Sequence, residues 1–272
     1  MAEISKKVLF VNSEIFPYLP DSDIARIGRN LPQGIQERKK EIRSFMPRFG
    51  CINERKNQLH EVIRLSGINI IIGDVDRPLV IKVASIPAAR MQVYFIDNED
   101  YFRRKAVYAD ADGRFFSDND ERAIFFAKGV LETVKKLRWA PDIIHCHGWI
   151  THLLPAYLKQ VYKDDPIFSN SKVVLSLYND IPSASFAADF AAKAATGSIK
   201  AEDLPICSQP DGIKLAETAA KYSDGIILGS PDLDSKLVKY CKDLKVPVLP
   251  YKAEIFEDGS YIDDYDALYD KL

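Results

Sequence analysis

The sequence predicts an α/β domain built on a doubly wound, mainly parallel sheet. Short apolar runs alternate with segments of helical periodicity along most of the chain, as expected for strands joined by crossover helices. One such unit stands out. Residues 142–144 (DII) predict a short buried strand, a polar turn at residues 145–148 follows, and a helical pattern begins at Trp149. This order places the polar residues at the carboxyl edge of the sheet, where open α/β proteins bind ligands.

The first elements are a strand at residues 7–11, a helix, and a second strand at residues 42–46. The helix is predicted by four apolar residues at helical spacing: Ile24, Ile27, Leu31 and Ile35. Asp21 or Ser22 is suited to cap it, whereas Pro32 predicts a kink or a break.

Residues 52–96 have a different texture and predict a β-rich embellishment of the α/β plan. Its strand-like runs are residues 61–65, 68–72, 79–84 and 91–96. Residues 97–104 are polar and predict a loop. A long helix over residues 121–137 follows, with Asp118 as its cap.

The remaining pattern continues the alternation up to about residue 250. The predicted strands are residues 172–177, 225–228 and 246–249, and the predicted helices are residues 213–222 and 231–242. The alanine-rich residues 184–197 fit either a small-residue helix or a mobile surface segment. We therefore expect one domain over residues 1–250, and a poorly ordered acidic tail over residues 251–272.

Composition excludes several classes of protein. The 272 residues are 47% hydrophobic and 28% charged with a net charge of −2, which argues against a nucleic-acid-binding protein. The basic group of Lys39, Lys40 and Arg43 is interspersed with acids and predicts a solvated helix face. No apolar run is long enough for a membrane helix, and the N-terminus lacks a signal-peptide core. Four scattered cysteines, without a CxxC pair, suggest reduced thiols in a cytoplasm.

The order of short motifs resembles the bacterial glycogen synthase and plant starch synthase family. Residues 11–17 (VNSEIFP) are similar to the opening SE-x-x-P of that family, and residues 47–50 (PRFG) to its PRYG. Residues 101–122 follow the series YF-x-R, Y, G and DN-x-x-R, and residues 141–149 (PDIIHCHGW) follow PDIVHAHDW. The resemblance implies a Rossmann-like domain equivalent to the N-terminal half of a two-domain GT-B glycosyltransferase, which uses ADP-glucose to extend α-1,4-glucan.

The sequence departs from this family at several functional positions. The family's Lys-Thr-Gly-Gly-Leu-x-Asp loop is replaced by residues 20–26 (PDSDIAR), so that acids oppose a diphosphate and no glycine-rich cradle remains. Gly148 stands where the family has the aspartate of HDW, and Leu177-Tyr178-Asn179 replaces IHN. The similarity covers roughly residues 6–240 and does not include the family's second, nucleotide-binding Rossmann domain. We therefore expect this chain alone to lack transferase activity.

The resemblance implies a set of candidate site residues. His147 aligns with the active-site histidine that contacts the transferred glucose, and a residual, hydrogen-bonded histidine is an equally good interpretation. The candidate substrate-binding residues are Ser13, Glu14, Asp118, Asn119, Arg122 and Asn179. A structural alternative is slightly favoured for two of them: Asp118 caps the helix, and Arg122 pairs with it one turn later. His145 is expected to pack beneath the site, and Cys146 to point to the opposite face as a small buried hydrophobe.

Three functions remain open on this basis. The first is a non-catalytic or regulatory protein of glycogen metabolism that binds α-glucan or ADP-glucose. The second is a half-enzyme completed by a separate nucleotide-binding domain or by homo-oligomerisation. The third is a metal-dependent hydrolase that uses the His-Cys-His turn. We expect no metal and no other cofactor, because the turn offers too few ligands for zinc and no carboxylate lies close by in the sequence.

Overall fold

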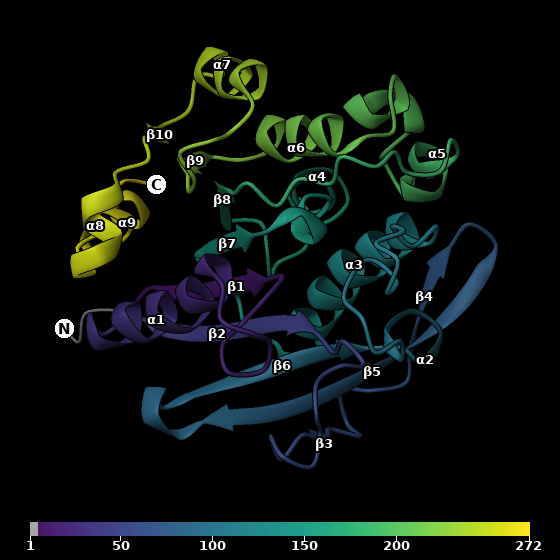
Figure 1. Ribbon diagram of the computed structural model, residues 1–272, viewed down its shortest axis with the longest axis horizontal. Coiled ribbons are helices and arrows are strands. Elements are labelled where there is room, and N and C mark those ends of the chain that lie inside the picture. Colours follow the sequence, from purple (N-terminus) through teal and green to yellow (C-terminus); the bar gives the residue numbers. More distant parts are fainter. Residues whose placement is uncertain (1–4) are drawn as a thin grey trace.

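Figure 1 shows the computed structural model, which describes residues 5–272 apart from the side chains of residues 254–256. The core is one mixed sheet. Its parallel strands are, in spatial order, β10 (Val248–Leu249), β9 (Gly225–Leu228), β8 (Lys172–Leu177), β7 (Ile143–His147), β1 (Lys7–Asn12), β2 (Glu41–Pro47) and β6 (Met91–Asp97). The predicted doubly wound, mainly parallel architecture is confirmed.

Antiparallel strands extend the sheet beyond β6. β5 (Val75–Ile86) pairs with β6, and both β3 (His60–Glu61) and β4 (Ile68–Ile72) pair with β5. β6 itself pairs in parallel with β2. The last five residues of β6 are all buried, as expected for a strand covered on both faces. Residues 52–96 are therefore not one unit: β6 belongs to the main sheet, and the embellishment consists of β3, β4 and β5.

Helices cover both faces of the sheet (Figure 1). α1 (Asp23–Glu37) and α9 (Tyr261–Lys271) pack on the face that carries Val8 and Phe10 of β1. α3 (Asn119–Leu137), α4 (Leu154–Gln160) and α6 (Gly212–Lys221) contribute to the larger core on the other face. This division follows from the alternation of side chains along the strands. The shorter helices are α2 (Glu99–Phe102), α5 (Phe190–Ala194), α7 (Ser235–Asp243) and α8 (Ala253–Asp258).

Local capping explains where two of the helices begin. The Ser22 side chain accepts a hydrogen bond from the backbone N–H of Ala25 at 3.0 Å and caps α1, which then continues through Pro32 without a break. The expectation of a loop over residues 97–104 is wrong. The Asn98 side chain accepts bonds from the N–H groups of Asp100 and Tyr101, so a short helix, α2, forms there.

The unit around the histidines also differs in detail from the predicted one. β7 does not end at Ile144 but continues through His147, because its ladder with β1 extends to the pair Asn12–His147. The single helix predicted after it is two pieces, a 3₁₀ turn over Trp149–Thr151 followed by α4. Pro155 lies in the first turn of α4. A backbone N–H at that position would have no acceptor within the helix, so proline removes no helical hydrogen bond.

The acidic tail is ordered, so the expectation of disorder is wrong. Tyr265, Leu268 and Tyr269 recur on one face of α9 and are at most 3% exposed. On its other face Asp266 pairs with Lys40 at 2.7 Å. Lys40 is therefore not part of a solvated helix face either, since its side chain is only 10% exposed. The acids that suggested disorder are counterions that hold α9 against the sheet.

No helix within residues 5–272 is long and apolar enough to span a membrane.

Candidate functional site

The direction of the chain reverses at the centre of the sheet. β2 and β6 lie on one side of β1, and the chain then returns to its other side through β7, β8 and β9. The edge of the sheet at the carboxyl ends of β1 and β7 is thus a topological switch point. Three segments meet there: Ser13 and Glu14 after β1, His147 and Gly148 at the end of β7, and Tyr178 to Asp180 after β8. The backbone N–H of Ser13 donates a hydrogen bond to the carbonyl of His147 at 2.9 Å, and this bond joins the first two segments.

His147 is fully buried at this point. Its Nδ1 lies 2.8 Å from the hydroxyl of Tyr178, and its Nε2 has no hydrogen-bond partner within the described residues. Burial lowers the pKa of His147 to about 3, because the imidazolium would lose its hydration. At neutral pH the imidazole is therefore uncharged, with one nitrogen anchored and one available.

His145 lies beneath His147 on the same face of the sheet, with 3.8 Å between the ring centroids. Its Nε2 contacts the Ser176 hydroxyl at 2.7 Å and its Nδ1 contacts the Tyr269 hydroxyl at 2.5 Å. Both ring nitrogens are thus engaged, and the expectation that His145 packs beneath the site is confirmed. Cys146 is buried in the core of the opposite face, also as expected. The described part of the chain contains no group of three or more His, Cys, Asp or Glu side chains arranged to hold a metal ion.

Glu14 lies beside the N-terminus of α1. Its carboxylate accepts a 2.6 Å hydrogen bond from Ser22, the residue that caps α1. Ser13 is 1% exposed, and its hydroxyl has no partner within residues 5–272. These two predicted residues therefore lie at the switch point with His147.

Asp180 is a site residue that the motif comparison missed. One oxygen of its carboxyl group accepts a hydrogen bond from the backbone N–H of Trp149 at 2.9 Å, and the other has no partner in the described chain. Burial, together with the charge of Glu14, raises the pKa of Asp180 to about 7. The available signal was positional: Asp180 follows β8, the neighbour of β7, at the same edge of the sheet.

Several buried polar atoms at the switch point have no hydrogen-bond partner among the described residues: Asn12 Oδ1, Ser13 Oγ, Tyr108 hydroxyl, His147 Nε2 and one oxygen of Asp180. Buried polar groups are normally satisfied, and an unsatisfied group costs about 1–3 kcal/mol. The Tyr108 ring packs on the Trp149 indole with 4.7 Å between centroids, so that aromatic surface adjoins these atoms. Unsatisfied donors and acceptors beside an aromatic wall are suited to a ligand rich in hydroxyl groups.

Asn119 and Arg122 form a buried cluster that contacts Tyr108 of the switch point. The guanidinium of Arg122 is fully buried against four aromatic rings and forms no ion pair within residues 5–272; its Nη1 donates a hydrogen bond to Asn119 Oδ1 at 2.5 Å. Burial lowers the pKa of Arg122 to about 10. The Asn119 amide donates to the carbonyl of Tyr108 at 2.8 Å. The rings around Arg122 are Phe49, Phe102, Tyr108 and Phe116. This pair therefore positions the Tyr108 segment.

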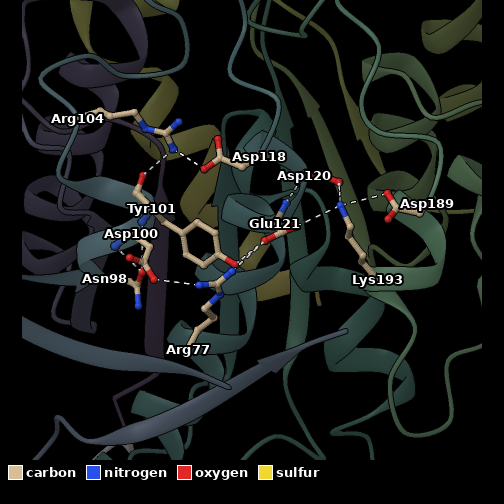
Figure 2. Close-up of polar contacts among 10 residues, drawn as sticks. All are labelled: Arg77, Asn98, Asp100, Tyr101, Arg104, Asp118, Asp120, Glu121, Asp189 and Lys193. Carbon is tan, nitrogen blue, oxygen red and sulfur yellow. Dashed lines mark hydrogen bonds and ion pairs between the residues drawn. The ribbon is translucent and has the colours of Figure 1, made fainter. Parts of the chain in front are cut away.

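Figure 2 shows the polar contacts around the N-terminus of α3. Asp118 stands at the cap position of α3, but its side chain makes no capping bond and pairs with Arg104 rather than with Arg122. In the first turn of α3, Lys193 of α5 bridges Asp120 and Glu121 at 3.1 and 3.2 Å. These contacts tie α3 to the preceding loop and to α5, and they do not include His147.

Asn179 is exposed after β8, and its backbone N–H donates to the Ser230 hydroxyl at 3.1 Å. No contact joins its side chain to His147 among the described interactions. The substrate-binding role of Asn179, Asp118, Asn119 and Arg122 remains a prediction.

The charge of Arg26, in the first turns of α1, is offset by two neighbouring acids. Arg26 pairs with Asp21 at 2.7 Å and approaches Asp23 at 3.9 Å. Arg26 is the positive charge that remains here in the absence of the family's loop lysine, and its guanidinium already interacts with Asp21 and Asp23. A cavity of about 400 Å³ lies nearby, between α1, the turn after β9 and α8, with Asp23 and Arg26 in its lining. None of the unpartnered atoms of the switch point belongs to that lining.

Comparisons with known proteins agree with this architecture. The family model of the starch synthase catalytic domain matches residues 7–241. The glycogen synthase of Chlorobium limicola is 43% identical over 180 residues, 66% of this chain and 37% of that protein. The glycogen synthase of Chlorobaculum parvum is 34% identical over 257 residues, 89% of this chain and 52% of that protein. The chain thus spans about a third to a half of the curated relatives it matches.

Among solved structures, the catalytic domain of starch synthase IV from Arabidopsis thaliana, bound to ADP and acarbose, superimposes with a TM-score of 0.72 at 17% identity. The match covers 92% of this chain and 52% of that one, and it shows the shared GT-B-type fold. The resemblance inferred from short motifs is therefore confirmed over most of the sequence. This chain therefore belongs to the glycogen and starch synthase family and corresponds to the N-terminal part of its members.

Proposed function

We propose that this domain acts in α-1,4-glucan metabolism by binding a saccharide at the switch point, and that alone it does not transfer glucose from ADP-glucose. The proposal makes the domain non-catalytic or regulatory when it acts by itself. A cytoplasmic location is part of the same proposal, supported by the free thiols of its four cysteines.

The observation that carries this proposal is the state of the loop before α1. Asp21 and Asp23 flank Arg26 and neutralise it. A diphosphate placed here would meet two carboxylates and a guanidinium that already has partners. Two like unit charges 4 Å apart repel by about 1 kcal/mol in water and about 4 kcal/mol near a protein surface. This repulsion is enough to weaken diphosphate binding by roughly tenfold or more.

The switch point has the same electrostatic bias. Glu14 and Asp180 both contribute negative charge, and the neighbouring His147 is neutral because burial lowers its pKa to about 3. The unpartnered Ser13 and Tyr108 hydroxyls can each donate and accept a hydrogen bond. An uncharged polyhydroxyl ligand satisfies such groups without charge repulsion, which favours a glucan over a sugar nucleotide.

A parallel calorimetric titration with maltoheptaose and ADP-glucose at pH 8 tests the proposal. We expect saturable binding of maltoheptaose, and no binding of ADP-glucose over the same concentration range. Tighter binding of ADP-glucose, with incorporation of labelled glucose into glycogen by the isolated chain, would overturn it. Incorporation that requires addition of a separate nucleotide-binding domain would instead favour the half-enzyme alternative.

A further inference from the structure

Gly148 adopts a backbone conformation that only glycine accepts readily. Its φ is 84° and its ψ is 154°, a region that costs other residues about 1–3 kcal/mol. A Cβ atom at this position would lie 2.1 Å from Ser13 Oγ and 3.0 Å from an Asp180 carboxylate oxygen. The aspartate that the family motif has at this position therefore does not fit the turn formed here.

A carboxyl group from another segment nevertheless lies next to this position. Asp180 reaches it from the turn after β8, within 3.0 Å of where the side chain of residue 148 would start. The N–H of Trp149 holds one oxygen of that carboxyl group, and the other oxygen is buried without a partner in the described chain. A loss of side chain at position 148 is thus matched by a carboxyl group supplied from position 180.

We propose that Asp180 is the ligand-recognising carboxyl group of the switch-point site, and that Gly148 is the residue that leaves room for it. The inference rests on the proposed saccharide function and names the acceptor that a saccharide hydroxyl meets. One oxygen of Asp180 is fixed by Trp149, and the free oxygen accepts the hydrogen bond from the ligand.

The surroundings of Asp180 make this recognition dependent on pH. The titratable groups that interact with it are Glu14 from the loop after β1, Tyr108 from the segment before α3 and Tyr178 from the turn after β8, whose hydroxyl contacts His147. Burial and the charge of Glu14 raise the pKa of Asp180 to about 7. The ionised carboxylate is the stronger acceptor. Ligand affinity should therefore rise with pH through neutrality.

The test measures maltoheptaose binding to the whole chain by calorimetry between pH 6 and pH 8.5, for wild type and for Asp180→Asn. Asparagine keeps an acceptor for Trp149 but carries no charge. We expect the wild-type affinity to rise about tenfold between pH 6 and pH 8, as a group with a pKa of about 7 ionises. We expect Asp180→Asn to bind about tenfold more weakly at pH 8, with no such rise.

Asp243→Asn is the matched control, since it removes an exposed carboxylate at the end of α7 and should leave both affinity and pH profile unchanged. A thermal unfolding curve for each variant establishes that it is folded. Wild-type binding that Asp180→Asn leaves unaltered at every pH would overturn the role of Asp180 and leave the proposed function standing. An absence of maltoheptaose binding to the wild type would overturn both.

Discussion

At the scale of single residues, the switch point combines polar side chains that are buried with hydrogen-bonding capacity that is not used. His147 Nε2, Ser13 Oγ and one oxygen of Asp180 have no partner within residues 5–272. Each lowers the stability of the folded chain relative to a satisfied group. Such groups are common where a binding site is preformed at the expense of stability.

The first prediction concerns the stability of Asp180→Asn. Aspartate in the unfolded chain has a pKa near 3.8, whereas that of Asp180 in the folded chain is about 7. Between these values the folded state binds more protons, so the wild type loses stability as pH rises and bears the full penalty above pH 7. Urea unfolding at pH 8 should show Asp180→Asn more stable than wild type by roughly 1–3 kcal/mol, with the difference fading toward pH 4. A less stable variant at pH 8 would mean that Asp180 serves mainly as the acceptor for Trp149.

The second prediction concerns Gly148→Ala. Its Cβ atom would overlap Ser13 Oγ at 2.1 Å in a backbone region that disfavours alanine. We expect a loss of roughly 2–4 kcal/mol in the free energy of unfolding. Gly113→Ala is the matched control, since Gly113 has a φ of 77° with no atom within 4 Å of the added Cβ. Equal losses for the two variants would show that the contact with Ser13 and Asp180 contributes nothing.

Of the pair Gly148 and Asp180, the sequence identifies only the first as a functional position. The residue comparison shows that position 148 lacks the family's carboxylate, because the motif is contiguous there. It does not show that Asp180 takes that place, since the two residues meet only through the relative position of the 3₁₀ turn at Trp149 and the turn after β8. Contacts of this kind depend on tertiary structure and leave no periodicity.

At the scale of elements, the largest difference between expectation and structure is α9. Its acidic composition suggests a disordered tail, whereas Tyr261, Tyr265 and Tyr269 lie at four-residue spacing and pack on the sheet. The salt bridges from Lys6, Arg38 and Lys40 offset its acidic charge. The sequence shows the tyrosine spacing, but not the basic residues, more than 200 positions away, that make the helix favourable.

The third prediction tests how α9 is attached to the site. Tyr269→Phe removes the hydroxyl that lies 2.5 Å from His145 Nδ1 and leaves a buried nitrogen without a partner. We expect a loss of about 1–3 kcal/mol in stability by urea unfolding. Tyr240→Phe on α7 removes the same hydroxyl from a half-buried side chain and should change stability by no more than about 0.5 kcal/mol. Indistinguishable values for the two variants would argue that α9 does not support the histidine pair.

At the scale of the whole molecule, the fold buries three histidines in uncharged form, two in β7 and one after the 3₁₀ turn at Trp149. Burial lowers the pKa values of His147 and His152 to about 3, and that of His145 well below its usual range. The alternation of strands and helices predicts this sheet from sequence, because short, mainly apolar runs separate the helical segments. It does not predict which polar residues outside the strands become buried, as His152 illustrates.

The fourth prediction follows from these histidines. In the unfolded chain they titrate near pH 6.5, so below that pH the unfolded state binds more protons and the folded state loses stability as pH falls. The slope should approach roughly 2–3 kcal/mol per pH unit between pH 6 and pH 4.5, since the carboxyl of Asp180 opposes it by about one proton. His152→Leu should reduce the number of protons taken up on unfolding by about one and so lower the slope, whereas His60→Leu, at an exposed position, should not. A slope that His152→Leu leaves unchanged would contradict the buried neutral state.

The most direct test of the saccharide site is a backbone amide shift map recorded by NMR during a maltoheptaose titration. The amides of Ser13 and Trp149, bonded to His147 and Asp180, should shift together with a single midpoint equal to the calorimetric dissociation constant. Shifts confined to the residues that line the cavity between α1 and α8, such as Asp23 and Ser230, would place the ligand elsewhere and contradict the account.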